Sequence, residues 1–371
     1  MEKRVAIIDP VGIKSGMNQY DIYLCQALDD LNVQTFIYSN FESHSKSIVS
    51  KLFFGTFFSS KLLQLIDFLK GIILSCIDCK RQGVKEVIVH VFSTHNMAFL
   101  TYLMCKLFGF KIITISHDVS SFTNQDNRLY HRLIYNHWSD YIIVHNEYSK
   151  ENILPLISPK VHSKIRIIKH GGFIELPDSN ITKANARKEL NLDFETPYIL
   201  FFGRFKSTKR LDILLRAMAG INSSIHLIIA GDTGKESFDI YQNLINKLGI
   251  SERVILDINY VSDSNRELYF KAADAMVLPY EIIFQSGVLL MAMSYGLPVV
   301  ASDIPPFKEV IEHNKNGLLF ESLNAKDLAH KINTLFEDKG SVHGFSKSAI
   351  ETINTTFSWD EIAANYKQLL S

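Results

Sequence analysis

Arg204 and Lys209 are the two side chains of this sequence best suited, by type and spacing, to hold a phosphorylated ligand. They follow Tyr198–Phe202, a continuous apolar run that predicts a buried strand, and Lys209 directly precedes a predicted helix. Arginine offers a fork of donors to two oxygens, whereas lysine offers a movable point charge. We therefore predict that this loop, with Gly203 at its start, binds a diphosphate. The alternative is that both cations are ordinary solvated loop charges.

A second anion-binding candidate is the turn formed by Gln285, Ser286, Gly287 and Val288. A strand precedes it, a helix begins at Ser286-Gly287, and a second strand follows, which together make a βαβ unit. Open α/β sheets bind ligands at the carboxyl edge of the strands, where this turn is expected to lie. The helix start supplies free N–H groups and a positive dipole end, and Gly287 lets an anion approach the backbone closely.

The first half of the chain offers polar residues at the equivalent sheet edge. His117 closes the predicted strand Lys111–Ser116 and is expected to face an interdomain cleft, where it could bind a sugar hydroxyl or act as an acid or base. The segment from Gly12 to Gly16 is expected to form a flexible loop over the same cleft, although it lacks a full GxGxxG pattern. His170, followed by two glycines, is interpreted mainly as part of a hinge. His95 and His145 are weaker candidates at strand ends.

These residues need a scaffold of alternating strands and helices, and the chain supplies two such alternations. Its 371 residues exceed what a single core usually holds, so two domains are expected. The predicted strands are continuous apolar runs, which is typical of parallel sheets covered on both faces. The boundaries are placed at residues 1–172, 173–356 and 357–371, the last segment being a closing helix that packs back toward the first domain.

Composition excludes several classes of protein. Lys+Arg and Asp+Glu are equal at 39 each, which argues against a nucleic-acid binder. Four cysteines do not suggest a disulfide framework. No secretory signal is recognised, and the longest apolar tract, from Leu62 to Cys76, is shorter than the roughly 20 residues that span a bilayer. A cytoplasmic protein, soluble or peripheral on the inner face of the membrane, is therefore expected.

Taken together, the sequence resembles the family 4, or group 1, glycosyltransferases of GT-B fold. The resemblance extends over nearly the whole chain. It is carried by FFGRFKSTKRLDILLRA, IIAGD, AADAMVLPY, the region of the QSG turn, PPFKEVIEHNKNGLLF and FSWDEIAANY. The order and spacing of these blocks are highly specific. The resemblance implies an α/β protein with two Rossmann-like, doubly wound parallel-sheet domains facing a cleft.

The family also implies a reaction, the transfer of a sugar from a nucleotide diphosphate sugar with retention of configuration. The acceptor would be a glycan or a lipid-linked molecule in cell-surface polysaccharide biosynthesis. By this resemblance Arg204 and Lys209 neutralise the diphosphate, and residues 286–288 present backbone N–H groups to the donor. His117 would lie near the transferred sugar. No metal-ligand cluster stands out, so transfer without a metal or other cofactor is expected.

The chain departs from the family pattern at one pair of positions. Most members carry a Glu-x7-Glu pair that grips the donor sugar and the ribose, and here Ile283 and Met291 occupy those positions. The chain thus resembles a branch without the pair. Glu281 or Asp303 could compensate, and Glu309, where the family often has a Glu, is interpreted as structural. A catalytically silent GT-B subunit and a sugar-nucleotide epimerase remain as alternatives. The donor sugar, its base, the acceptor and the oligomeric state are not predicted.

Residues 52–81 form a segment rich in Phe, Leu and Ile with interleaved basic residues. One interpretation is an interfacial helix that brings the enzyme to a lipid-linked acceptor at a membrane. The other is an amphipathic helix that covers the first sheet. The loop-like phenylalanines Phe53, Phe54, Phe57 and Phe58 favour the membrane slightly.

Overall fold

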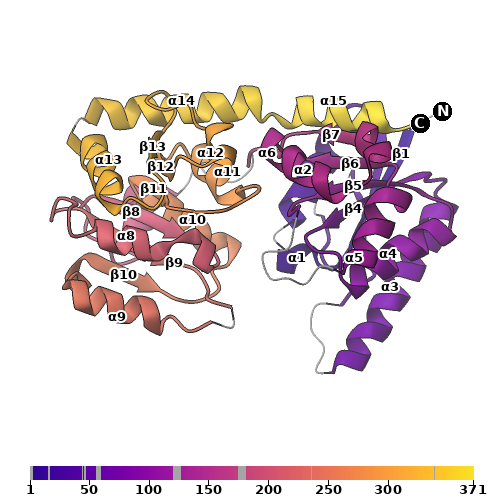
Figure 1. Cartoon of the computed structure of the whole chain (residues 1–371), viewed down its shortest axis with the longest axis horizontal. Helices are drawn as coiled ribbons and strands as arrows, with labels where there is room; N and C mark the ends of the chain where they lie inside the picture. Colours follow the sequence, from indigo (N-terminus) through magenta and orange to yellow (C-terminus); the bar gives the residue numbers. More distant parts are fainter. Residues whose placement is uncertain are drawn as a thin grey trace. The chain divides into compact units, whose positions relative to one another are not determined.

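The computed structural model describes residues 3–15, 17–43, 45, 47–55, 60–119, 127–173, 181–234, 236–337 and 339–371. The chain divides into two compact units. Figure 1 draws them in colours that follow the sequence. The first unit is Met1–Gly171 with Phe357–Ser371, and the second unit is Gly172–Thr356. The boundary falls one residue before the expected end of the first domain.

The first unit is built on a seven-stranded sheet in which every strand pair is parallel. Its strands are β1 (Lys3–Asp9), β2 (Val33–Ser39), β3 (Val49–Leu52), β4 (Glu86–Val91), β5 (Lys111–Ser116), β6 (Tyr141–Val144) and β7 (Ile165–Ile167). The order is β3-β2-β1-β4-β5-β6-β7, so the direction of winding reverses between β1 and β4. Loops that follow these two strands lie at the switch point, where doubly wound sheets bind ligands.

Helices of the first unit cover the two faces of its sheet (Figure 1). They are α1 (Gly12–Ser15), α2 (Asn18–Asp30), α3 (Lys61–Arg81), α4 (Asn96–Leu107), α5 (Arg128–His131), the π-helix η1 (Arg132–Trp138), α6 (Glu147–Ile153), the 3-10 turns η2 (Leu154–Leu156) and η3 (Pro159–Lys164), and α15 (Trp359–Leu369). α15 lies beside α2, where the Tyr366 and Tyr20 hydroxyls are 2.9 Å apart. The closing segment thus packs within the first unit.

The second unit repeats this architecture with a six-stranded parallel sheet. Its strands are β8 (Tyr198–Phe202), β9 (His226–Ala230), β10 (Val254–Asp257), β11 (Ala275–Leu278), β12 (Val299–Ser302) and β13 (Leu318–Phe320). Its helices are α7 (Lys183–Glu189), η4 (Ser207–Lys209), α8 (Leu211–Ala217), α9 (Asp239–Leu248), η5 (Ser251–Arg253), α10 (Asp263–Ala272), α11 (Gly287–Ser294), α12 (Pro305–Lys308), α13 (Ala325–Glu337) and α14 (Lys339–Thr356). The order β10-β9-β8-β11-β12-β13 places the switch point between β8 and β11.

The predicted fold class, two Rossmann-like doubly wound domains, is confirmed. Some elements differ from expectation. The edge strands β3 and β13 were not predicted. In β3, Ser50 and Lys51 interrupt the apolar run, and β13 has only three residues. The expected flexible loop after β1 contains the short helix α1, in which Gly12 is buried. Among the described helices, none is long and apolar enough to cross a membrane.

Candidate functional site

The loops after β8 and β11 meet at the switch point of the second unit. The first loop runs from Gly203 through η4 to Arg210, and the second runs from Pro279 to Ser286, where α11 begins. A backbone hydrogen bond from the Glu281 N–H to the Thr208 carbonyl (2.9 Å) ties the two loops together. The Arg210 guanidinium adds an ion pair to the Glu281 carboxylate at 2.9 Å. The two segments predicted to bind phosphate are therefore held as one structure.

Gly203, Lys209 and Val288 come together at the centre of this arrangement. Gly203 has a φ of +100°, and a Cβ built there would lie 3.3 Å from Lys209 Nζ and 3.6 Å from Val288 Cγ2. The lysine amine therefore lies over the glycine backbone, beside the first turn of α11. Glycine is favoured here because the left-handed φ and the close approach both exclude a side chain.

Lys209 is held in surroundings that oppose its charge. Its amine lies 5.2 Å from the centre of the Tyr280 ring, and Tyr280 is itself buried. Desolvation and the nearby Lys206 lower the pKa of Lys209 to about 7, and Asp232 only partly offsets them. An arriving diphosphate would reverse this effect, because an opposite charge within a few ångströms favours the protonated amine.

Arg204 lies on the same loop but in a more open position. Its side chain is 59% exposed, and Nε is 3.8 Å from an oxygen of Asp232, which follows β9. Gly234 allows this position, because a Cβ there would meet Arg204 Nη2 at 2.4 Å. A contact of 3.8 Å across exposed side chains is weak, so the guanidinium can exchange Asp232 for a phosphate without losing much energy.

The start of α11 supplies backbone donors next to Lys209. The Ser286 hydroxyl caps the helix by accepting a hydrogen bond from the Leu289 N–H at 3.2 Å. The amides of Gly287 and Val288, at the first helical positions, have no partner within a helix and can serve an anion. Gly287 is open, since a Cβ there would come no nearer than 3.9 Å to a described atom. Gln285, at the end of the preceding loop, is half-buried.

Apolar side chains occupy the two positions where the family carries its glutamate pair, and neither side chain is fully exposed. Met291 is 7% exposed within α11, and Ile283 is half-buried in the preceding loop. Of the two suggested substitutes, Glu281 is engaged by Arg210. Asp303 accepts from the Ser322 N–H at 3.1 Å and pairs with Lys308 at 3.3 Å. Both carboxylates therefore hold loops together, which weakens the case that either replaces a glutamate of the pair.

His117 lies in the first unit, and its surroundings are more elaborate than its place after β5 predicts. It is 6% exposed, and its Nε2 lies 2.7 Å from Nδ1 of His90 on β4. Nε2 of His90 is in turn 2.8 Å from Asp21 on α2. Burial, with smaller effects of nearby histidines, lowers the pKa of His117 well below its usual value. His117 is therefore neutral at physiological pH, which removes the option of a charged acid.

The other predicted polar residues of the first unit have structural partners. His145 Nδ1 and His170 Nδ1 each lie 2.8 Å from a carbonyl, of Ile168 and Gly171 respectively. His95 caps α4 by accepting from the Ala98 N–H. Gly12 packs against the Phe41 ring, which a Cβ would meet at 2.5 Å, and this gives the glycine a packing role. Gly16 lies outside the described residues.

One group of described residues has the composition of a metal site. Ligand atoms of Asp9, Asp21 and His90 all lie within 4.8 Å of one another. Both nitrogens of His90 are already engaged, by Asp21 and by His117, so neither is left to coordinate a cation. We interpret the group as a hydrogen-bonded network.

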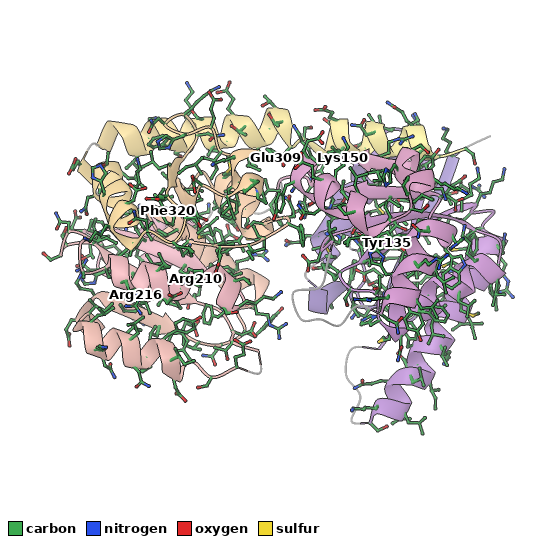
Figure 2. The ribbon with its side chains drawn as sticks, in the orientation of Figure 1. Tyr135, Lys150, Arg210, Arg216, Glu309 and Phe320 are labelled. Atoms are coloured by element: carbon green, nitrogen blue, oxygen red, sulfur yellow. The ribbon has the colours of Figure 1, made fainter. Side chains whose placement is uncertain are left out.

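A cavity of about 690 Å³ adjoins the loop after β8 on its other side. It is lined by Thr208, Arg210, Arg216, Tyr241 and Leu244, among others, which come from η4, α8 and α9. Figure 2 labels Arg210 and Arg216 at the start and near the end of α8. Because Gly203, Lys209 and α11 do not line this cavity, we do not assign the diphosphate to it.

Sequence reasoning missed Asp21, His90 and Tyr280 as neighbours of the predicted site residues. A signal existed for two of them. His90 interrupts an apolar strand run, and Asp21 stands on the apolar face of an amphipathic helix. A buried polar residue is more informative than a buried apolar one. Which partners they meet depends on strand order, which the sequence alone did not supply.

Comparison with known proteins places these features in context. Residues 182–352 match the family described as "Glycosyl transferases group 1". An uncharacterized glycosyltransferase of Methanocaldococcus jannaschii is 26% identical over 247 residues, which cover 65% of this chain and 62% of that protein. A D-inositol 3-phosphate glycosyltransferase of Corynebacterium aurimucosum is 25% identical over 235 residues, which cover 62% of this chain and 53% of that protein. The chain therefore spans less than two thirds of either relative.

Two solved structures resemble the whole chain. A sucrose-phosphate synthase from Thermosynechococcus elongatus superimposes with a TM-score of 0.77 at 20% identity, covering 99% of this chain and 98% of the other. HepE of Anabaena, in complex with UDP-glucose, superimposes with a TM-score of 0.76 at 18% identity and the same coverage. At this level of identity the likeness shows the fold.

Proposed function

We propose that this chain, which has the GT-B fold and matches the group 1 glycosyl transferases over residues 182–352, is a retaining glycosyltransferase. The donor is a nucleoside diphosphate sugar. The acceptor is a glycan or a lipid-linked molecule that is extended during assembly of a cell-surface polysaccharide.

The observation that carries the proposal is the meeting of Lys209, Gly203 and the start of α11 at the switch point of the second unit. A lysine amine over a glycine backbone, next to free helix N–H groups, is a site for a compact anion with several oxygens. Arg204 stands on the same loop with only a weak ion pair. A diphosphate offers enough oxygens to engage all of these donors together.

The same donors explain how the site can promote transfer. Breaking the bond between the sugar and the diphosphate leaves negative charge on the leaving phosphate. Charges and dipoles placed in advance stabilise that charge as it develops, and removing one such donor typically costs about 100-fold to 1,000-fold in kcat. We assign this role to Arg204 and Lys209, with the Gly287 and Val288 amides as further donors. His117 is assigned to the sugar, and no metal or other cofactor is required by this scheme.

Support for the donor class comes from the similar structure of HepE, which was solved with UDP-glucose. UDP is therefore the first diphosphate to test. Ile283 and Met291, in place of the glutamate pair, offer the ribose no carboxylate. They are also the feature that favours a second candidate, a catalytically silent subunit that binds a sugar nucleotide.

We also propose that the first unit meets a lipid surface through the start of α3. Leu62 is 66% exposed, and Leu63, Leu65 and Ile66 are exposed beside it. Figure 1 shows this end of α3 extending beyond the rest of the first unit. Lys61 and Lys70 are exposed on the same helix and suit anionic lipids. Membrane binding at this helix would bring the enzyme to a lipid-linked acceptor.

The phenylalanines expected to touch the membrane do not support that contact where they are described. Phe53 stacks on Tyr38 with ring centroids 5.6 Å apart, and Phe54 is 5% exposed against Phe68 of α3. Both belong to the packing of the first unit. Phe57 and Phe58 lie outside the described residues.

A thermal-shift series with UDP, GDP, ADP and TDP tests the donor site. A ligand that binds only the folded protein raises its stability by RT ln(1 + [L]/Kd). We expect one diphosphate to raise Tm in the parent, and Arg204→Ala to weaken the shift and to lower kcat at least about 100-fold. Arg216→Ala, an exposed arginine on α8, is the matched control and should behave like the parent.

The outcomes separate the two candidate functions. Binding of a diphosphate with turnover of its sugar supports the transferase. Binding without turnover of any supplied sugar nucleotide favours the silent subunit. If no diphosphate shifts Tm, and Arg204→Ala matches the parent, the proposed phosphate site is wrong.

A further inference from the structure

The first unit contains a buried chain of polar side chains that runs from Asp21 through His90 to His117. The phosphate-binding residues of the second unit do not use it. We infer that Asp21 and His90 are positioning residues, which hold His117 as a neutral hydrogen-bond donor directed at the substrate. This inference rests on the proposed function in one respect, the role of His117 at the sugar.

The first link of the chain fixes one proton of His90. Asp21 is fully buried, and its Oδ1 lies 2.8 Å from His90 Nε2. Burial raises the pKa of the Asp21 carboxyl, and the adjoining His90 opposes that rise. Paired with a charged His90, the carboxylate only accepts hydrogen bonds, so Nε2 of His90 carries the hydrogen. A second carboxylate, Asp9, lies in the same cluster and is 1% exposed. Their outer oxygens, Oδ2 of Asp9 and Oδ2 of Asp21, are buried without a hydrogen-bond partner among the described residues.

The second link places one proton between two imidazoles. His90 Nδ1 and His117 Nε2 are 2.7 Å apart, so one of them donates and the other accepts. Their rings are inclined by only 16° with centroids 5.0 Å apart, which directs the bond close to both ring planes. Bonds of 2.7 and 2.8 Å on the two sides of His90 have the length of charge-assisted hydrogen bonds.

The surrounding charges decide where that proton lies. His90 faces the two carboxylates, whereas His117 faces mainly other histidines. Burial opposes a charge on His90, but Asp21 outweighs it and raises the pKa of His90, while the pKa of His117 is lowered. His90 therefore keeps both of its hydrogens and donates through Nδ1. His117 accepts at Nε2, and its single hydrogen remains on Nδ1.

The ring of His117 is also fixed against rotation. Phe92 lies parallel to it with a centroid distance of 4.6 Å and an interplanar angle of 12°. Tyr20 meets it edge-on at 5.9 Å, and His145 lies at 5.1 Å. With Nε2 occupied by His90, only the Nδ1–H edge can meet a ligand. His117 is therefore built to donate a hydrogen bond to a sugar oxygen. Its one unprotonated nitrogen, Nε2, is occupied by His90, so it cannot act as a general base on the ligand.

The first experiment reads the histidine protonation states of the unmodified protein. Long-range proton–nitrogen spectra of ring-labelled histidine distinguish protonated from bare nitrogens, with His117→Ala and His90→Gln used for assignment. We expect His90 to show two protonated nitrogens near pH 7, and His117 to show a protonated Nδ1 with a bare Nε2. A protonated Nε2 and an unprotonated Nδ1 on His117 would overturn the inference, and this result does not depend on transferase activity.

The second experiment asks whether Asp21 acts through His117. Asp21→Asn keeps the shape but allows the amide to donate, which reverses the hydrogen-bond direction along the chain. We expect kcat to fall about 10-fold to 100-fold, by analogy with the loss when a partner that orients a metal-ligating histidine is changed. Diphosphate affinity should not change. Asp30→Asn, on the exposed end of the same helix, is the control.

A double-mutant cycle separates positioning from general structural damage. If Asp21 acts through His117, adding Asp21→Asn to His117→Ala should cost no further activity. An additive loss would overturn the inference, and so would stoichiometric metal in the purified protein that Asp21→Asn releases. If the parent transfers no sugar at all, the proposed function fails, and the spectra still decide the protonation states.

Discussion

Lys209 shows how a single residue can be prepared for a ligand at a cost to the free protein. Lys209 is half-buried, its amine lies over Gly203 and the Tyr280 ring, and desolvation lowers its pKa to about 7. A lysine whose pKa is lowered on folding disfavours the folded state whenever the amine is charged. Nucleotide binding supplies the missing negative charge, so the same residue destabilises the free protein and strengthens the complex.

This balance predicts a pH-dependent affinity. The diphosphate binds the protonated amine, so binding above pH 7 must take up a proton, and affinity should fall about 10-fold between pH 7 and pH 8.5, about one logarithmic unit for each unit of pH well above the pKa. Calorimetry at pH 8 in two buffers of different ionisation enthalpy measures the proton uptake directly. Lys209→Arg keeps its charge over this range and should bind without uptake. Equal uptake by the parent and Lys209→Arg would contradict the assignment.

The stability of the free protein should respond with the opposite sign. Between pH 7 and the ordinary lysine pKa, the unfolded chain holds the proton that the folded chain has released, so the free energy of unfolding rises with pH. Lys209→Met removes this cost. We expect its Tm at pH 6.5 to exceed that of the parent by about 2–4 °C, the shift for roughly 1 kcal/mol in a domain of this size. A Tm equal to or below that of the parent would show that the lysine is not under strain.

At the scale of elements, the loops at the switch point are packed backbone against backbone. Gly231, after β9, has a φ of +141°, and a Cβ there would lie 2.1 Å from the Gly203 carbonyl oxygen. Gly249, the left-handed cap of α9, has a φ of +66° but no described atom within 4 Å of such a Cβ. Both glycines therefore have a positive φ, but only at Gly231 would an added Cβ meet neighbouring atoms.

This difference gives a matched pair of substitutions. Gly249→Ala should cost about 1 kcal/mol, the usual penalty for a left-handed residue without other conflict. Gly231→Ala should cost clearly more, because the Gly203 backbone must move, and it should also weaken diphosphate binding. Urea midpoints and Kd values measure the two effects. Equal midpoints for both variants would mean that the loops are loosely packed.

The start of α3 allows a test of membrane contact at the level of one helix. Replacing Leu62, Leu65 and Ile66 by Gln removes apolar surface worth about 1.5–3 kcal/mol for each side chain if it is buried in lipid. Binding to anionic vesicles should fall at least about 100-fold, with Tm unchanged, because these side chains are exposed. Leu107→Gln and Ile240→Gln, at exposed sites elsewhere, are the controls. If the parent itself does not sediment with vesicles, the membrane proposal fails.

The elements that positioned the phosphate site could be predicted because their signals are local. Tyr198–Phe202 and Ala275–Leu278 are buried on every residue, so their apolar runs mark both strands without error. Glycines and Ser286 then mark the turns that follow. The Asp21–His90–His117 chain could not be found in this way. Its members come from α2, β4 and the end of β5, and they meet only because β1, β4 and β5 are neighbours in the sheet.

At the scale of the whole molecule, the first unit is discontinuous in sequence. Trp359 of α15 is 2% exposed, meets Tyr20 of α2 at 5.0 Å, and covers Gly171, where a Cβ would lie 2.2 Å from its indole. Trp359→Ala should destabilise the first unit by about 3–5 kcal/mol. Hydrogen exchange should show α2 losing protection while α11 keeps it, with Gln368→Ala on the exposed face as control. Equal loss in both units would mean that they unfold together.

Closure of the first unit by α15 has a consequence for the order of events during translation. The second unit, Gly172–Thr356, leaves the ribosome as one uninterrupted segment and can fold at once. The first unit is made earlier but lacks Phe357–Ser371 until the whole second unit has been made, so the face of α2 that holds Tyr20 stays uncovered during that time. The unit made first is therefore completed last, and a chain that terminates early would expose that apolar face to chaperones and proteases.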